Sequence, residues 1–283
     1  MIRESWTAPP HFTRALPQQQ APAREAHVNL RGGKIFYWDT GGTGTPIVLM
    51  HPATGSAHMW LYQQPAFAAA GHRVIAWSRR GHQGSDPVDR ANPGSASQDL
   101  IDLLDHLNIA QAHLVASAAG GAISFDAALA FPNRIASLVI SSSVGGAQDQ
   151  DYLTASASIR PQGFDTWPSD FREIGPSYRA ADPEGVQRWL ALEHAAVTGE
   201  RLGQKPLTHV TFAALEALTM PVQLMTGDAD LWMPPVFMRR YAQHIKQAEL
   251  VIIPECGHAL YWEAPELFNA QALTFLKRIE KRS

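Results

Sequence analysis

The sequence predicts an α/β protein built on a doubly wound, mostly parallel sheet. Three observations lead to this prediction: short runs of apolar residues recur along the chain, segments with helical spacing lie between them, and the connections are short. A continuously apolar run suits a strand that is buried on both faces of a parallel sheet. Strands that alternate with helices through short links favour the doubly wound arrangement.

The expected strands begin with a hairpin within residues 27–39, where Arg31-Gly-Gly33 forms the turn. The later strands are the apolar runs at residues 47–50, 74–77, 114–115, 138–140, 222–225 and 250–253. Between them, four leucines repeat at helical spacing over residues 100–107, and residues 120–130 form a helix that Pro132 stops. An apolar stripe over residues 268–279, with basic residues in its last turn, predicts a C-terminal helix.

The alternation ceases between about residues 145 and 219, where aromatic residues and prolines are mixed with segments of helical length. We therefore expect an extended segment over residues 1–26, running across the surface, and a core made of residues 27–144 and 220–283. Residues 145–219 are expected to form a helical lid with its own small core. Open α/β sheets bind ligands at the carboxyl ends of their strands, so the lid is expected there.

The composition limits the kinds of partner that this protein is expected to bind. A net charge of -3 and the lack of a basic block argue against nucleic acid. No apolar run approaches the ~20 residues that cross a membrane, and Met1 to Trp6 contain no signal-like apolar segment. The single cysteine, Cys256, suits a reducing compartment, so a cytoplasmic location is expected. No metal cluster or dinucleotide motif is evident, so we expect a small-molecule substrate without a cofactor, and the oligomeric state stays open.

A sharp turn before the helix at 120–130 carries the main functional signal. Residues 116–120 read Ala-Ser-Ala-Ala-Gly, and such small residues permit a tight strand–turn–helix bend. In a nucleophile elbow of the pattern G-x-S-x-G, the central residue projects from the turn. That position is Ala118, so the turn is retained while its nucleophile is absent.

Five segments resemble, in the same order, motifs of the α/β-hydrolase superfamily, and the resemblance covers roughly residues 27–281. They are an oxyanion loop at 50–56, a D-x-R-G-x-G-x-S turn at 78–85, the elbow at 116–120, an acid-bearing loop at 226–230 and a late G-H motif at 256–258. The resemblance implies the α/β-hydrolase fold with a lid. The chain departs from the family pattern at Pro52, Ser78, Gln83 and Ala118.

The resemblance also implies a role for single residues. His258 is the expected base, since imidazole with an ordinary pKa takes a proton near neutral pH. Asp230 is the expected acid, which would accept the Nδ1–H of that histidine and fix its tautomer. Asp228 is the less favoured acid. The backbone N–H groups of Ala53 and Ala119 are the expected oxyanion donors.

Aromatic residues near the motifs predict a largely apolar substrate, with aromatic and alicyclic compounds as the candidates. The Arg79-Arg80 pair is expected to have a structural role and is not assigned to an anionic substrate. The residues expected to line the substrate pocket are Pro52, Trp60, Trp167, Trp189 and Trp232.

Ser117 is an alternative nucleophile. Choosing it shifts the elbow by one residue, which places Val115 and Ala119 where the turn needs very small residues. Nothing in the pattern activates the Cys256 thiol. Position 118 is therefore kept as the nucleophile position.

Ala118 leaves three functions open. In the first, the protein is a hydrolase of a small apolar ester, lactone or C–C substrate, and Ala118 is an inactivating Ser→Ala change. In the second, alanine is native and the His258–Asp230 dyad is the general base of a serine-independent, cofactor-free lyase, decarboxylase or oxygenase. The third, a non-catalytic ligand-binding protein, is least favoured because a binder needs neither His258 nor Asp230. The frequency of hydrolysis in this fold favours the first.

Overall fold

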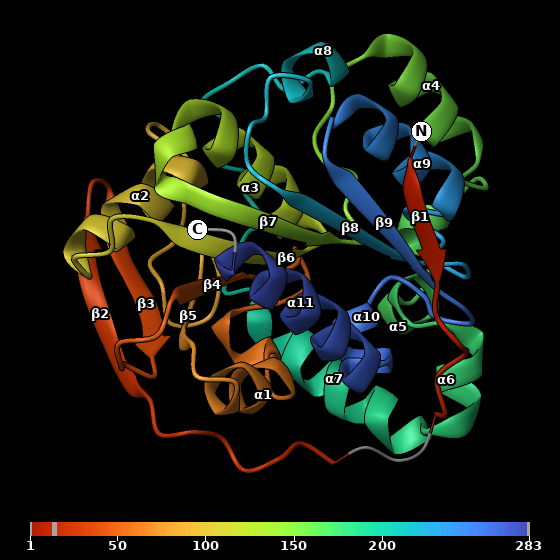
Figure 1. The fold of residues 1–283 in the computed structure, drawn as a ribbon, viewed down its shortest axis with the longest axis horizontal. Coiled ribbons are helices and arrows are strands. Elements are labelled where there is room, and N and C mark those ends of the chain that lie inside the picture. Colours follow the sequence, from red (N-terminus) through yellow and green to blue (C-terminus); the bar gives the residue numbers. More distant parts are fainter. Residues whose placement is uncertain (1, 13–15, 282–283) are drawn as a thin grey trace.

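The computed structural model describes residues 2–12 and 16–281. Nine strands of this described chain form one sheet in the order β1-β9-β8-β7-β6-β4-β5-β3-β2 (Figure 1). Neighbouring strands are parallel except β2 with β3 and β3 with β5, which are antiparallel. The predicted α/β fold with a mostly parallel, doubly wound sheet is confirmed.

The elements include every predicted strand and helix. The strands are β1 (Arg3–Trp6), β2 (Arg24–Leu30), β3 (Gly33–Asp39), β4 (Pro46–Met50), β5 (Arg73–Trp77), β6 (Ala112–Ser117), β7 (Ile135–Ser141), β8 (Val222–Gly227) and β9 (Ala248–Ile253). The α-helices are α1 (Gln63–Ala69), α2 (Ala96–His106), α3 (Ala119–Ala130), α4 (Gln150–Ser158), α5 (Ser169–Glu173), α6 (Pro176–Ala181), α7 (Pro183–Ala196), α8 (Phe212–Leu215), α9 (Pro235–His244), α10 (Leu260–Glu263) and α11 (Pro265–Glu280). Short 3₁₀ helices are η1 (Ala57–Met59), η2 (Pro132–Arg134) and η3 (Phe164–Thr166). None of these helices is long and apolar enough to span a membrane.

Both faces of the sheet are covered by helices, which explains why the central strands are apolar throughout. Along β4, Ile47 and Leu49 enter one buried cluster, whereas Val48 and Met50 enter the other. Successive side chains of a strand point to opposite faces, so a strand with both faces buried has no polar side. Helices α2, α3 and α9 cover one face, and α1, α10 and α11 lie on the other (Figure 1).

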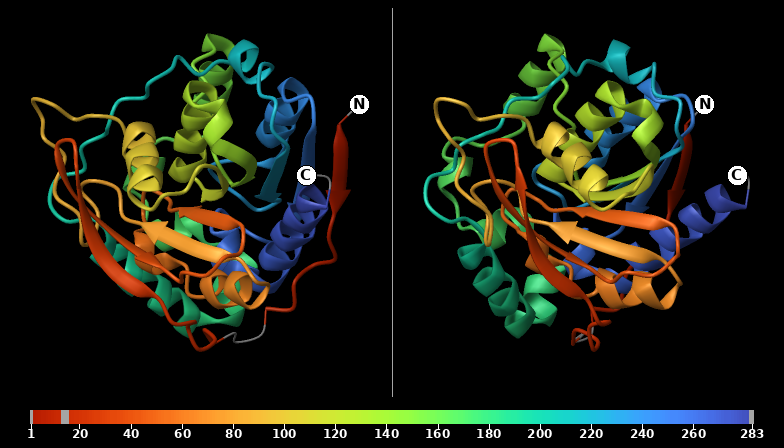
Figure 2. Two further views of the ribbon diagram at one scale, coloured as in Figure 1. Left: turned by 60° about the vertical axis from the view of Figure 1, so that its left-hand side comes forward. Right: turned by 90° about the vertical axis from the view of Figure 1, so that its left-hand side faces the viewer.

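The N-terminal segment spans the sheet from edge to edge. β1 pairs in parallel with β9 at one edge, and β2 lies at the opposite edge. Between them, residues 7–12 and 16–23 lie near helices α6 and α1 (Figure 2), where Phe12 contacts the ring of Tyr178 and Ala21 exchanges hydrogen bonds with Gln64. The sequence predicted an extended segment over residues 1–26 but not β1, since this strand is exposed and polar. Residues 1 and 13–15 of that segment lie outside the described chain.

The helical insertion contributes residues to both buried clusters of the protein. Tyr152 and Phe212 join the cluster on the α9 side and pack on Tyr241. Tyr178 and Trp189 join the opposite cluster. The insertion is therefore anchored on both layers of the protein. Its division from the core, as a lid over residues 145–219, stays a prediction, and residues 282–283 of the predicted core lie outside the described residues.

The β6–α3 turn packs closely against the end of β4. A Cβ atom at Gly120 would lie 2.0 Å from the carbonyl oxygen of Met50. A Cβ at Gly121 would lie 2.5 Å from Oγ of Ser143. A backbone carbonyl in a central strand cannot move aside as a flexible side chain can, so position 120 requires glycine for this close approach.

We expect Gly120→Ala to destabilise the protein by on the order of 3 kcal/mol, because overpacking here displaces a central strand. Urea unfolding followed by circular dichroism measures the loss. Gly203→Ala is the matched control, since a Cβ there meets nothing within 4 Å. Equal stability of the two variants would contradict the packing described for this turn.

Candidate active site

Ala118 occupies the tip of the turn between β6 and α3, in a backbone conformation that alanine rarely adopts. Its φ is 49° and its ψ is -117°, which is a strained region for a residue with a Cβ. The N–H of Ala118 donates to the carbonyl of Ser141 at 3.0 Å, and Oγ of Ser143 donates to the Ala118 carbonyl at 2.6 Å. These bonds to the end of β7 fix the turn without any contribution from the Ala118 side chain.

The structure brings His258 and Asp230 together. Nδ1 of His258 lies 2.9 Å from each carboxylate oxygen of Asp230. Oδ1 of this carboxylate also accepts the N–H groups of Trp232 and Met233, at 2.8 and 2.9 Å. Both members of the pair are buried. The carboxylate is held from both sides, so it can fix the orientation and tautomer of the imidazole.

Residues next to Asp230 and His258 hold together the two loops that carry this pair. A Cβ at Gly227 would lie 2.0 Å from the carbonyl oxygen of Cys256, so glycine lets the loops approach each other. Asp228 is exposed, and its carboxylate accepts the N–H of Glu255 at 2.5 Å. Burial raises the pKa of the Cys256 thiol, which keeps it protonated. Asp228 thus braces the histidine loop and has no bond to His258.

Glu173, at the end of α5, is a site residue that the sequence analysis missed. Its Oε2 lies 4.0 Å from Nε2 of His258, the ring nitrogen not bound to Asp230. Its backbone carbonyl accepts the N–H groups of His258 and Ala259 at 2.8 and 2.9 Å. No motif marks this position, because the contact joins the insertion to a loop far along the chain.

A second buried acid holds that contact in place. The carboxylate of Glu263 accepts the N–H of Gly175 at 2.8 Å and the N–H of Gly257 at 2.9 Å. Gly175 follows α5, and Gly257 precedes the histidine. The two chain segments are therefore clamped by one carboxylate, and burial raises the pKa of Glu263 to about 7.

Carboxylates dominate the electrostatics of the imidazole. Burial by itself lowers the pKa of His258, but the charges of Asp230 and Glu173 outweigh it and raise this pKa to about 9. Burial in turn raises the pKa of Glu173. The sequence analysis expected an imidazole with an ordinary pKa. The raised pKa instead favours the protonated imidazole at neutral pH, and the free base forms as the pH rises toward 9.

A cavity in two adjacent parts lies beside the elbow, and one of these parts reaches Ala118. We call the part lined by Ala118, His258, Tyr152, Leu153 and Trp232, among others, the apolar chamber; its volume is about 380 Å³. The larger part, of about 560 Å³, we call the basic chamber, because its lining includes Arg79, Arg80, His82, Arg201 and Lys205. Residues Ala53, Ala119, Gly146 and Gln148 line both. The chambers therefore meet beside the elbow.

The two expected oxyanion donors lie at this junction. Within the described residues, neither the N–H of Ala53 nor that of Ala119 donates to a protein acceptor. Nη2 of Arg79 donates to the Pro52 carbonyl at 3.0 Å. The C=O and N–H of a trans peptide point in opposite directions, so this bond also orients the N–H of Ala53. Two backbone donors are thus left for a ligand.

Two of the five expected pocket residues line the apolar chamber, namely Pro52 and Trp232. Trp60 and Trp189 are fully buried in the helical layer, where both contact Tyr261. Trp167 packs between two phenylalanine rings of the insertion. These three are not among the chamber's lining residues, which corrects the expectation for them. Proximity to a motif in sequence did not indicate on which side of its loop each ring lies.

Ser117 lies within β6, not at the tip of the turn. It is 1% exposed, and its hydroxyl has no hydrogen-bond partner within the described part of the chain. It is not among the residues that line the chambers around Ala118. Its burial gives the hydroxyl no path to a substrate.

The assembled groups suit chemistry at a carbonyl. Two free N–H groups can bind a developing oxyanion, and a histidine paired with a carboxylate can transfer a proton. No group of three or more His, Cys, Asp or Glu side chains that could hold a metal ion is found in residues 2–12 and 16–281. The fold and this site define the α/β-hydrolase class.

Comparisons with known proteins agree with this assignment. The model of the alpha/beta hydrolase family matches residues 47–271. The acetyltransferase component of the acetoin cleaving system of Pseudomonas putida is 31% identical, over 92% of this chain and 71% of that protein. A 2-hydroxy-6-oxononadienedioate/2-hydroxy-6-oxononatrienedioate hydrolase of a Pseudomonas species is 28% identical, over 87% of this chain and 93% of that protein. A thermophilic esterase of Thermogutta terrifontis has the same fold, with a TM-score of 0.71 at 23% identity, over 91% of this chain and 99% of the esterase.

The chain belongs to the alpha/beta hydrolase family. It is an α/β-hydrolase-fold enzyme of the hydrolase type, a class whose members act on small molecules.

The raised pKa of His258 can be tested without a substrate. We expect nuclear magnetic resonance titration of its ring to give a midpoint near pH 9. Glu173→Gln should lower this midpoint, because it removes a carboxylate that stabilises the imidazolium. Asp228→Asn, which changes an acid without contact to the ring, should leave it unchanged. A midpoint near the ordinary value in the unmodified protein would contradict the electrostatics described here.

Proposed function

We propose that this site belongs to a hydrolase of small, largely apolar ester, lactone or C–C substrates, with His258 and Asp230 as its proton-transfer dyad. The Ala53 and Ala119 N–H groups form the oxyanion hole. Ala118 stands where the reaction requires a serine, as an inactivating replacement. The observation that carries the proposal is the His258–Asp230 pair, whose histidine lines one chamber together with Ala118.

The chamber supports the substrate class. Its lining is mostly apolar, with Val144, Ala147, Tyr152, Leu153 and Trp232 around the elbow. Its volume of about 380 Å³ lies within the range of small-molecule sites. The related protein of Pseudomonas is named as a hydrolase of a 2-hydroxy-6-oxo dienedioate, and the fold neighbour of Thermogutta as an esterase.

The strained elbow supports the assignment of position 118. A non-glycine residue in such a conformation costs about 1–3 kcal/mol, and this strain is typical of functional sites. An alanine side chain gains nothing from being presented to a histidine, whereas a serine hydroxyl would be activated by it. Loss of a nucleophilic serine lowers turnover by on the order of 10⁶ in the subtilisin case.

We expect Ala118→Ser to create esterase activity toward short p-nitrophenyl esters, with a gain of at least ~10³-fold over the unmodified protein. The hydroxyl must lose its proton to neutral His258. The rate should therefore rise with pH, reach half of its maximum at about pH 9, where half of the imidazole is deprotonated, and level off only above that pH. Initial rates between pH 6 and pH 10 measure both effects.

Two further substitutions made on top of Ala118→Ser serve as controls. His258→Ala should abolish the gained activity, because it removes the base. Ser117→Ala should preserve it, since Ser117 is buried within β6. If Ala118→Ser gives no gain while the protein stays folded, the hydrolase proposal is wrong. Tight ligand binding without any product would then favour the non-catalytic function.

A second candidate function is a serine-independent lyase, decarboxylase or oxygenase in which alanine is native. The observation that favours it is the carboxylate of Glu173, 4.0 Å from Nε2 of His258, the nitrogen that would otherwise serve a serine hydroxyl. The carboxylates of Asp230 and Glu173 raise the pKa of His258, so the dyad can accept a proton from an acidic C–H and the two carboxylates stabilise the imidazolium that forms.

This candidate predicts that the protein, with Ala118 in place, exchanges the acidic α-protons of a simple ketone. Incubation with 4-phenyl-2-butanone in D₂O, followed by proton spectroscopy, measures the exchange. His258→Ala and Glu173→Gln should each reduce it to the background rate. Exchange that is absent, or that persists in both variants, would exclude the dyad from serine-independent proton abstraction.

A further inference from the structure

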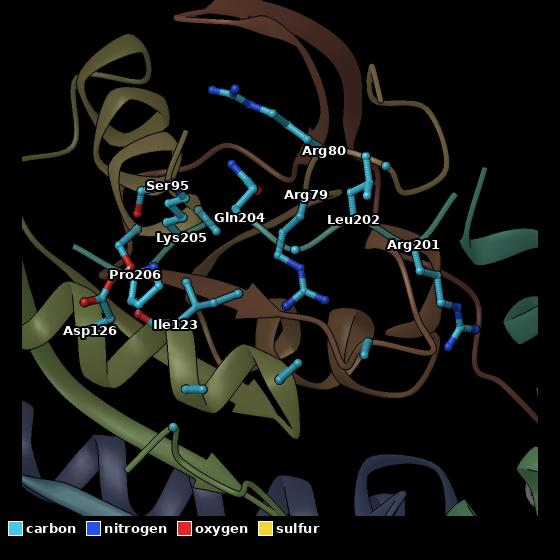
Figure 3. A pocket seen from close by; sticks show the side chains of 18 of the residues that line it. Arg79, Arg80, Ser95, Ile123, Asp126, Arg201, Leu202, Gln204, Lys205 and Pro206 are labelled. Atoms are coloured by element: carbon cyan, nitrogen blue, oxygen red, sulfur yellow. Dashed lines mark hydrogen bonds between the residues drawn. The ribbon is translucent and has the colours of Figure 1, made fainter. Parts of the chain in front are cut away.

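The basic chamber holds one buried cation that the proposed function does not use. Arg79 is 7% exposed, and no carboxylate of the described chain forms an ion pair with it. Figure 3 shows its guanidinium toward the middle of the chamber. Burial lowers the pKa of Arg79 to about 9, which leaves it charged at neutral pH. A buried charge without a counter-charge is costly, so such a group calls for an explanation.

The hydrogen bonds of Arg79 leave most of its guanidinium donors available. Nη2 donates to the Pro52 carbonyl and lies 3.3 Å from Nδ1 of His51. Nδ1 of His51 also lies 2.7 Å from the Pro52 carbonyl oxygen, and its Nε2 accepts the backbone N–H of Arg79. The proton of this imidazole therefore lies on Nδ1, which cannot accept from the arginine. Within the described residues, the Pro52 carbonyl is the one acceptor for the guanidinium.

Other cations of the same chamber are neutralised. Arg80 forms a buried ion pair with Asp99 at 2.6 Å, and Arg201 pairs with Glu193 at 3.3 Å. Figure 3 shows both arginines directed away from Arg79. Lys205 is exposed.

The acidic side chains that line the basic chamber also have hydrogen-bond or ion-pair partners. Asp126 accepts bonds from Ser97, Leu207 and Thr208. Glu200 pairs with Arg90. Among the described residues, no carboxylate of the chamber is left to neutralise Arg79, so a ligand can supply its counter-charge.

The position of Arg79 links this charge to the reacting centre. Its guanidinium binds the carbonyl of Pro52, whose peptide carries the N–H of Ala53. Ala53 and Ala119 line both chambers. A substrate whose carbonyl reaches these two N–H groups can place one end in the apolar chamber and the other in the basic chamber.

We propose that Arg79 binds a carboxylate of the substrate, so that the enzyme acts on carboxylated carbonyl compounds with an apolar remainder. The inference rests on the proposed function, because it names the substrate class of the same site. A guanidinium forms two parallel, charge-assisted hydrogen bonds with a carboxylate. We thus assign Arg79 to the ligand, whereas Arg80 keeps the structural role that was expected of the Arg79-Arg80 pair.

Two other cations at the cavity are poorer receptors for an anion. His258 already has the carboxylates of Asp230 and Glu173 around it, so a third negative charge would be repelled. Arg160 lies over the ring of Trp232, 4.9 Å from its centre, and is only partly buried. Its charge is stabilised by that ring and by water.

Equilibrium binding tests this inference independently of catalysis. Isothermal titration calorimetry at pH 7 compares 5-phenylpentanoate with 5-phenylpentanamide, a neutral probe of the same shape. We expect the unmodified protein to bind the carboxylate at least tenfold more tightly. Arg79→Met should remove this preference and leave the affinity for the amide unchanged. Arg79→Lys should weaken carboxylate binding less, since it keeps the charge but loses the paired hydrogen bonds.

Lys205→Met and Arg160→Met are the matched controls, and both should retain the preference. No preference in the unmodified protein, or no binding of the carboxylate at millimolar concentration, would overturn the inference. A preference that survives Arg79→Met, or one that is lost in Arg160→Met, would also overturn the inference. If Arg79→Met fails to fold, unchanged carboxylate binding in Arg79→Lys would also overturn it. Failure of Ala118→Ser to gain esterase activity would leave these affinities unaffected, so the two proposals fail separately.

Discussion

The active-site geometry depends on the contact between the β6–α3 turn and the end of β4. Because Gly120 has no side chain, the first turn of α3 packs directly on the Met50 carbonyl. This contact brings the N–H of Ala119 beside the loop that carries Ala53, so that both donors line the same junction. The strained backbone of Ala118 is held by oxygens at the end of β7. The turn is therefore maintained by packing and backbone bonds, and it persists without a nucleophilic hydroxyl.

The negative charges around His258 come from the insertion as well as from the loop that follows β8. Asp230 on the β8 side orients His258, which any enzyme of this arrangement requires. Glu173 from α5 then adds a second negative charge on the opposite nitrogen, and Glu263 holds that segment in place. These acids convert a histidine of ordinary pKa into one that is protonated at neutral pH. The insertion thereby sets the pH range in which the dyad can act as a base.

The sequence predicted the central sheet well and the site in part. Runs of apolar residues identify strands with two buried faces, and the motif order identifies Ala118, Asp230 and His258. β1 was missed because it is short, polar and exposed, so only its pairing with β9 marks it. Glu173 was missed because its contact depends on how the insertion folds back. The sequence did not indicate the proposed role of Arg79, because that role depends on the described residues around it in space, none of which gives it a carboxylate partner.

We propose that position 118, where alanine provides no nucleophilic hydroxyl, faces a functional oxyanion hole and the His258–Asp230 dyad. The most direct measurement is a crystal structure of Ala118→Ser after reaction with a p-nitrophenyl alkylphosphonate. We expect a covalent bond to the introduced Oγ, with the phosphonyl oxygen roughly 2.7–3.1 Å from the nitrogens of both Ala53 and Ala119. Absence of an adduct, or an adduct whose oxygen points away from these two nitrogens, would contradict it.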